Sequence, residues 1–390
     1  MITIVHNIMA AVGEGGAAAL IKHKLNEWSY PQYFVSATVV LLIIGLATYR
    51  IWTRPKVAAG LAVFFLVFYV WSATDPNFIK IIAKPDNVPI TIMLVFTALV
   101  TWLAFRQAAI NDERMERGAP LIESGADDKV LVWPDLVYTE MICLVLCSIA
   151  LTVWAILLKA PLEPPANPTN IPNPSKAPWY FLGLQELLVY FDPWIAGVLL
   201  PLLIIFGLVA LPYIDKNPRG NGYYTFAQRK FVISVFMFGW GIMWVVLIVL
   251  GTFLRGPNWN IFGPYETWDP HRPAALLNIN VSDVFWVVIP SALNADWWKP
   301  GLPTESFAGI PGYLVREAPG WILLGFYFAV LPGILAATVF RKIYRDIGFI
   351  RFAVFWTLMS WMFLVPIKMV LRWGFNLKYF LAQTEWFFNV

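Results

Sequence analysis

The chain has 390 residues, of which 59% are hydrophobic and only 13% are charged. An ordinary soluble domain has about 25% charged residues, so this composition excludes a soluble globular protein and indicates an integral membrane protein. The formal net charge is only +4, and the basic residues are scattered between apolar runs rather than gathered in blocks. Nucleic acid is therefore not an expected partner.

Eight apolar runs are long enough to cross a bilayer, which takes about 20 helical residues. In chain order these runs are 33–52, 57–73, 88–105, 136–158, 194–214, 231–254, 321–340 and 352–371. The sequence therefore predicts an all-α integral membrane fold with about eight transmembrane helices.

Two stretches between these runs are too polar or too broken to span a membrane. The first is a charged connector at 106–134, whose block at 111–117 is expected to be solvated helix or loop, and the second is an aromatic, proline-rich segment at 255–319. We accordingly predict three regions. Residues 1–134 hold three helices and a cytoplasmic connector, residues 135–254 form a central region, and residues 255–390 hold an outer aromatic loop, two helices and an interfacial tail.

The basic residues indicate the orientation, because short cytoplasmic connections are enriched in lysine and arginine. One set of alternate connections carries most of them: Arg50, Arg54, Lys56, Arg106, Arg114, Arg117, Lys129, Lys216, Arg219, Arg229, Lys230, Arg341, Lys342, Arg345 and Arg351. We expect this face to be cytoplasmic, in a multi-pass protein of a bacterial cytoplasmic membrane. Both termini, the loop near 160–178 and the 255–319 segment are then on the outer, periplasmic face.

A proline-rich loop precedes the fifth span, with prolines at 161, 164, 165, 168, 172, 174 and 178. Proline lacks an amide donor and restricts the residue before it, so this stretch cannot form a regular helix or a central strand. Lipid cannot satisfy free backbone groups, and the loop must lie at a membrane face or be buried in protein there.

The motifs within 133–254 resemble, in kind and order, the C-terminal half of cytochrome b, called subunit IV where cytochrome b is split. In that family a span ends in a Glu-Pro-Ala-Asx-Pro loop, a Pro-Glu-Trp-Tyr-Phe motif follows on the outer face, and two more spans come next. The corresponding stretches here are Glu163-Pro164-Pro165-Ala166-Asn167-Pro168, Ala177-Pro178-Trp179-Tyr180-Phe181 and the exit Pro212-Tyr213-Ile214-Asp215. The resemblance implies a subunit of a quinol:cytochrome c oxidoreductase that is not active alone.

The resemblance also implies a quinol-oxidation site on the outer face, for menaquinol or ubiquinol. Its wall would consist of Pro178, Trp179, Tyr180, Phe181 and Gln185. The alternative for the three aromatic residues is an ordinary interfacial belt. The family has a glutamate at the position of Pro178, so the proton acceptor must come from elsewhere in this chain.

Glu186 is the candidate catalytic base, because it is the nearest carboxylate and lies in an otherwise apolar helical stretch. An apolar site raises the pKa of a carboxyl group toward the range that suits a base. The alternative is that Glu186 only caps a helix or pairs with a cation. Glu140 and Asp192 are candidates for a proton path, and Asp192, which precedes Pro193, is alternatively the N-cap of the fifth span.

The chain lacks the ligands of the family's cofactors. Its histidines, His6, His23 and His271, lie outside the predicted spans, and two cysteines cannot hold an iron–sulfur cluster. We expect no metal and no haem in this chain. The expected partners are a haem b-carrying subunit like the N-terminal half of cytochrome b, a Rieske 2Fe-2S protein, a cytochrome c-type acceptor and membrane lipids. The outer segment 257–300 is expected to contact the Rieske or cytochrome c subunit.

Two other functions are compatible with the sequence. A structural scaffold subunit of a respiratory or photosynthetic complex would bind neighbours and lipid without forming a quinone site, and the missing motif glutamate favours it. A secondary transporter is the third possibility, but the spans show few internal charges and no broken helices of the kind that transporters use.

Overall fold

A computed structural model of the protein describes residues 16–125, 130–158, 165, 167–169, 176–217, 222–273, 277–294, 314–383 and 388–390. The described part is nearly all helical. Its one sheet pairs the two-residue strands Ala382–Gln383 and Phe388–Asn389 in antiparallel fashion. The predicted all-α fold is therefore confirmed.

Seven helical segments are long and apolar enough to cross a membrane. Three of them are single helices: α4 (Pro55–Ser72), α6 (Asn87–Glu116) and α18 (Phe349–Phe375). Two more are the segment Val132–Leu157, which contains α7 (Val137–Leu157), and the segment Ile195–Ile214, which contains α9 (Leu200–Ile214). The last two are Lys230–Leu254, which begins with α10 (Lys230–Phe236), and Ala318–Ala337, which contains α15 (Ala318–Gly325) and α16 (Leu331–Ala337). The helix Gly16–Trp28 and α2 (Pro31–Ala47) meet at 89° and make an eighth candidate. The prediction of about eight spans is confirmed.

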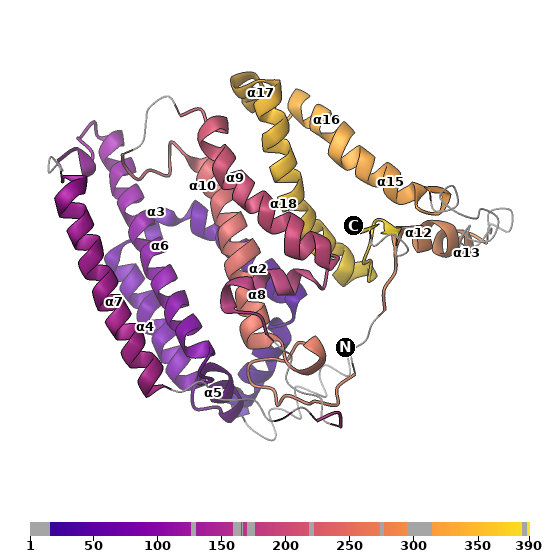
Figure 1. Ribbon diagram of the computed structural model, residues 1–390, viewed down its shortest axis with the longest axis horizontal. Coiled ribbons are helices and arrows are strands. Elements are labelled where there is room, and N and C mark those ends of the chain that lie inside the picture. Colours follow the sequence, from indigo (N-terminus) through magenta and orange to yellow (C-terminus); the bar gives the residue numbers. More distant parts are fainter. Residues whose placement is uncertain are drawn as a thin grey trace.

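Shorter helices connect these spans. They are α3 (Tyr49–Trp52), α5 (Pro76–Ile82), α8 (Trp179–Leu187), α12 (Val281–Asp283), α13 (Ile289–Ala292) and α17 (Arg341–Ile347). Figure 1 shows α4, α6 and α7 together on one side, α8, α9, α10 and α18 in the centre, and α15 with α16 diverging on the other side. Connections lie at two ends of this array. We call them the α8 end and the Asp112 end, after a helix and a residue found there.

The main core lies where α8 and the segment 195–200 meet the last turns of span 230–254 and the second half of α18. Its fully buried side chains include Phe191, Leu247, Leu250 and Met369. Away from this core the spans expose large apolar side chains, and in span 132–157 none of the residues is buried. Those surfaces suit lipid or neighbouring subunits, because apolar surface of this extent is not left in water.

The predicted charged connector begins as helix. The third span was expected to end at residue 105, but α6 continues to Glu116. Alanine, glutamine, glutamate and arginine in this stretch favour helix, and two of its polar residues, Asn111 and Asp112, are completely buried against other parts of the chain. The expected helix is thus present, but Asn111 and Asp112 are buried rather than solvated.

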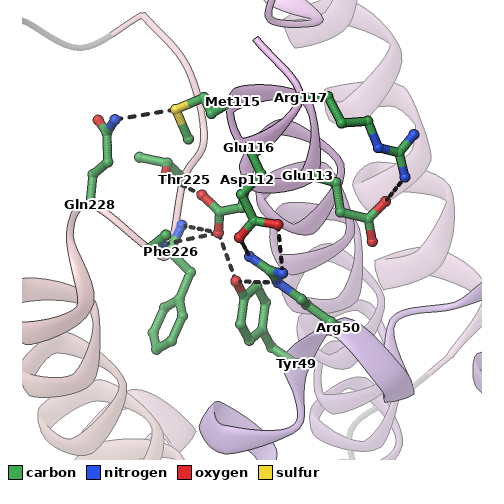
Figure 2. A network of polar contacts seen from close by, with 11 residues as sticks. Tyr49, Arg50, Asp112, Glu113, Met115, Glu116, Arg117, Thr225, Phe226 and Gln228 are labelled. Carbon is green, nitrogen blue, oxygen red and sulfur yellow. Dashed lines mark hydrogen bonds and ion pairs between the residues drawn. The ribbon is translucent and has the colours of Figure 1, made fainter. Parts of the chain in front are cut away.

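Asp112 accepts hydrogen bonds from two other segments at its end of the molecule (Figure 2). The Tyr49 hydroxyl donates to Oδ2 at 2.9 Å, and the backbone amides of Phe226 and Ala227 donate to the same oxygen at 3.1 and 3.0 Å. The Thr225 hydroxyl donates to Oδ1. Since each donor comes from α3 or from the connection before α10, the carboxylate ties the N-terminal helices to the central region.

The chain returns to the α8 end after α18. Lys368 is 1% exposed, and its ammonium group lies 5.2–5.4 Å from the ring centroids of Phe191, Tyr379 and Phe380. It also donates a hydrogen bond to the carbonyl of Lys378. The cation thus holds the chain after α18 against the core, through cation–π contacts and one charged hydrogen bond.

We expect Asp112→Asn to destabilise the protein by about 2–4 kcal/mol, because an amide nitrogen would meet donors where the carboxylate accepts four hydrogen bonds. The measurement is reversible unfolding in mixed detergent micelles. Glu113→Gln is the matched control on the same helix, since Glu113 is 40% exposed and its Arg117 partner is 3.9 Å away. Its effect should be below about 0.5 kcal/mol. Equal effects of the two substitutions would contradict the role given to Asp112.

Candidate functional site

Helix α8 lies in close contact with the last turns of span 230–254. A Cβ atom added at Gly183 would come within 3.3 Å of the Trp244 carbonyl oxygen, and one at Gly251 within 3.1 Å of the Leu182 carbonyl oxygen. Both distances are tighter than ordinary van der Waals contact. Two glycines therefore let α8 approach this span backbone to backbone, and the approach fixes the position of the predicted quinol-site residues.

The predicted aromatic residues lie at the start of α8 and remain accessible. Trp179, Tyr180 and Phe181 are 37%, 46% and 49% exposed. Their rings contact one another in sequence order, with centroids 5.6 Å and 4.6 Å apart. Trp244 supports them from span 230–254, because its indole nitrogen donates to the Tyr180 carbonyl at 3.3 Å. We call these three aromatic residues the α8 rim.

Pro178 and Gln185 shape the entrance to α8. Pro178 is the exposed residue that precedes the first turn, where its lack of an amide hydrogen costs nothing. The Gln185 side-chain oxygen accepts a hydrogen bond from the backbone amide of Ala177 at 2.9 Å. This bond fixes the end of the proline-rich loop against the helix. Glu163, Pro164 and Ala166 of the predicted loop motif lie outside the described residues.

Glu186 is completely buried on the inner face of α8 and forms an ion pair with Arg255. Arg255 Nε donates to Glu186 Oε2 at 2.8 Å, and Nη2 donates to Oε1. Arg255 is itself only 7% exposed and follows directly after span 230–254. Both carboxylate oxygens are therefore engaged by one planar guanidinium group, in the bidentate geometry that arginine favours.

Arg255 extends this pair to the segment that follows it. Its Nη1 donates to the carbonyl of Trp259, and the guanidinium lies 5.8 Å from the Trp259 ring centroid. Tyr190, 1% exposed, lies in the same region, and burial followed by the nearby Glu186 charge raises the pKa of its phenol. Its hydroxyl accepts from Trp373 Nε1 at 3.2 Å. The pair is thus the polar centre of an otherwise aromatic core.

The first part of the outer aromatic segment packs on other parts of this chain. Phe262 and Tyr265 are buried, and the Tyr265 hydroxyl lies 2.7 Å from the Ser72 hydroxyl at the end of α4. Other residues of the segment are exposed, among them Asn258, a group around Asp269–His271, and Leu277 and Leu293 further on.

The two proton-path candidates lie apart from each other. Asp192 Oδ1 accepts the amide of Trp194 at 3.1 Å, with Pro193 between them, which confirms the N-cap interpretation for the span that follows. Glu140 is exposed on α7, and Figure 1 places α7 at the far edge of the array from α15. Glu140 therefore lies away from Glu186. Glu140 and Asp192 do not form one path.

Three residues of this site were not predicted from the sequence, namely Arg255, Gly183 and Gly251. Arg255 had a visible signal, since it is a lone cation at the end of one apolar run while Glu186 is a lone acid in another. The glycines carried a weaker signal, because a helical glycine is informative only when its neighbour across the interface is known. Among the described residues, no group of three or more histidine, cysteine, aspartate or glutamate side chains is placed to hold a metal ion.

Residues 165–268 match the family described as Cytochrome b(C-terminal)/b6/petD. The match covers α8, spans 195–214 and 230–254 and the start of the outer segment, so it supports the resemblance over this part of the chain. The fourth span, which we had included from Trp133 onward, lies outside the matched range. No curated protein and no solved structure matches the chain. The family indicates a membrane subunit of a cytochrome bc-type complex, a class of oxidoreductases that use quinone and haem.

Lys176 gives this end of the molecule a measurable pH dependence. Its ammonium group donates to the Thr252 carbonyl at 2.6 Å, and burial, followed by repulsion from Lys84, lowers its pKa from 10.5 to about 8. The unfolded chain then binds more protons than the folded protein between pH 8 and 10.5, so stability should rise with pH across that window. We expect the free energy of unfolding of the wild type, relative to Lys176→Met, to increase over this range by at most about 3 kcal/mol.

The comparison with Lys176→Met removes the contribution of the other titrating groups. Lys80→Met is the matched control, because Lys80 is an exposed lysine of α5 and is not one of the charges that shift the pKa of Lys176. The difference in free energy of unfolding between this variant and the wild type should not change over the same pH range. If the difference in free energy of unfolding between Lys176→Met and the wild type is also independent of pH, the buried position of the Lys176 ammonium group would be contradicted.

Proposed function

We propose that this chain, whose residues 165–268 match the cytochrome b C-terminal family, forms one wall of an outer-face quinol-oxidation site in a quinol:cytochrome c oxidoreductase. The observation that carries the proposal is the α8 rim. Trp179, Tyr180 and Phe181 stay exposed on a helix whose opposite face is fixed by glycine contacts and an ion pair. A rigid aromatic surface of this kind suits a flat quinol ring.

The rim is one wall only, so the proposal includes neighbouring subunits. A haem b-carrying subunit would close the site from the membrane side, and a Rieske 2Fe-2S protein would approach from the outer side. Quinol would give one electron to each of these centres, and its two protons would leave on the outer face. The acceptor beyond the Rieske protein would be a cytochrome c-type protein.

Glu186 enters this proposal in one of two roles. As the proton acceptor, its carboxylate would have to leave Arg255 and reach the rim side of α8. As a positioning residue, it would remain paired and hold α8 in place. The bidentate buried pair supports the positioning role, because separating the two charges without new partners costs about 3–5 kcal/mol. Water or a partner side chain would then receive the quinol protons.

A non-catalytic scaffold subunit is the second candidate. One argument for it is that Pro178 has no acid–base group in its side chain. The other is that both carboxylate oxygens of Glu186 already accept hydrogen bonds from Arg255. The two candidates differ in whether the α8 rim contacts substrate, and substitution of the rim therefore separates them.

We expect Tyr180→Leu to lower kcat/KM for quinol-dependent cytochrome c reduction by the intact complex by roughly tenfold, through loss of aromatic contact with the ring. Tyr213→Leu is the matched control. Tyr213 is 74% exposed and lies near the end of the next span, away from α8. Its substitution should leave kcat/KM unchanged. An unchanged value for both variants in a correctly assembled complex would favour the scaffold.

The same assay distinguishes the two roles of Glu186. For a positioning residue, Glu186→Gln and Arg255→Gln should lower turnover by similar factors and leave the shape of the pH–rate profile unchanged. If Glu186 is the proton acceptor, the Glu186→Gln variant should lose the acidic limb of the pH–rate profile. The Arg255→Gln variant should keep that limb. We expect the first pattern. Loss of the acidic limb in Glu186→Gln alone would contradict it.

A further inference from the structure

The span 132–157 differs from the other spans because no side of it is packed. None of its residues is buried, whereas each of the other six spans buries part of its most apolar stretch. Figure 1 shows α7 at the edge of the array, beside α4 and α6. This helix therefore meets lipid or another subunit on all sides, and its side chains indicate which side meets which.

One face of α7 carries an acid followed by small side chains. Its residues recur at intervals of three or four positions, which places them on one side of a helix, and all of them are exposed: Glu140, Cys143, Cys147 and Ala150. The two thiol sulfurs lie 3.9 Å apart, as residues on one side should. The opposite face carries larger apolar side chains, among them Val145, Ile149 and Ile156. We call the first of these the Glu140 face.

Glu140 is the residue of this face that requires a partner. It lies inside the apolar span, about 7–8 Å along the helix axis from Asp135 at the span's start. Its carboxylate takes part in no ion pair and no hydrogen bond with the described residues. A carboxylate at this depth is unfavourable in lipid without a cation, and a protonated carboxyl group would still carry a donor that hydrocarbon cannot satisfy.

Other charged groups that this chain withdraws from water are compensated within it. Glu186 pairs with Arg255, Asp112 accepts four hydrogen bonds, and Lys368 contacts three aromatic rings. Glu140 differs from them, because no other helix of the described chain covers α7. Its compensation therefore has to come from outside this chain.

We propose that the Glu140 face binds a membrane-spanning helix of another subunit, and that this helix carries a lysine or arginine paired with Glu140. The small side chains at positions 143, 147 and 150 let the two backbones approach closely along the rest of the contact. Glu140 lies near the Asp112 end, since α7 follows α6, and the basic residues predict this end to be cytoplasmic. Spanning helices are commonly flanked by lysine and arginine at that end, and their long side chains reach the required depth.

A second copy of this chain is a poorer occupant of the same face. A symmetric contact through α7 would place two Glu140 carboxylates opposite each other without a cation between them. Lipid tails supply no cation either, and they suit the face with Val145, Ile149 and Ile156. The inference holds whether the chain forms a wall of a quinol site or serves only as a scaffold, so it goes beyond the proposed function.

The first measurement is photocrosslinking of the intact complex in its own membrane. The photoreactive amino acid p-benzoylphenylalanine replaces Cys147 on the Glu140 face or, as the matched control, Val145 on the opposite face of the same helix. We expect position 147 to crosslink to an apolar peptide of another subunit that ends in a lysine or arginine. Position 145 should give at least tenfold less of this product, and its crosslinks should be to lipid.

The second measurement exchanges the charges and uses no bulky side chain. Glu140→Gln should lower the affinity for the crosslinked subunit in detergent by roughly three- to tenfold, and Glu140→Lys should lower it further, because it places two cations together. Replacing the partner's cation by glutamate should restore binding to Glu140→Lys. Asp135→Asn is the matched control, because Asp135 is an exposed acid at the start of the same span. It should leave the affinity unchanged.

Three results would overturn the proposal. Crosslinks to lipid alone from both positions would show that the Glu140 face lies in lipid. A crosslink from position 147 to a second copy of this chain would assign the face to self-association. Unchanged affinity in Glu140→Lys would remove the ion pair. The readout is assembly rather than turnover, so a failure here is distinct from a failure of the oxidation site at the α8 rim.

Discussion

The buried ion pair between Glu186 and Arg255 is the constraint on which the α8 end depends. A charge without a partner in this environment would be strongly unfavourable, so each residue requires the other. Glu186 belongs to α8, while Arg255 begins the outer segment and also binds the Trp259 carbonyl. One guanidinium group therefore holds the rim-bearing helix, the end of a span and the following segment in a single arrangement.

The close contacts at two glycines make the ion pair between Glu186 and Arg255 possible. Gly183 and Gly251 allow α8 to lie against the span closely enough for Glu186 to meet the first residue after that span. The rim residues lie on the outward side of the same nine-residue helix. Its inner face is thus committed to packing and charge pairing, and its outer face is left aromatic and accessible. Rigid support under an exposed aromatic surface is what a binding wall requires.

The spans and the family resemblance could be predicted from the sequence, because apolar runs and the proline-aromatic motif are local patterns. The burial of polar residues in the extension of α6 could not, since Asp112 is buried against donors far away in the chain, such as Thr225, which lies 113 positions further on. The same limit applies to Glu186. Its apolar surroundings and its two possible roles were visible, but its Arg255 partner lies 69 positions further along the chain. Sequence periodicity carries no information about such pairs, whereas a lone acid and a lone cation in apolar runs give a weak hint.

Buried polar groups at the two ends of the molecule explain how loosely packed spans can hold one arrangement. The sides of the spans are mostly exposed and apolar, so the hydrophobic effect gives them little preference between one another and lipid. Asp112 at one end, and Glu186 with Lys368 at the other, instead join segments that are distant in sequence. These buried hydrogen bonds and ion pairs favour one arrangement of the segments, because their donors and acceptors cannot be satisfied by lipid. The sides of the spans are then free for neighbouring subunits, as the proposed place of the chain in a larger complex requires.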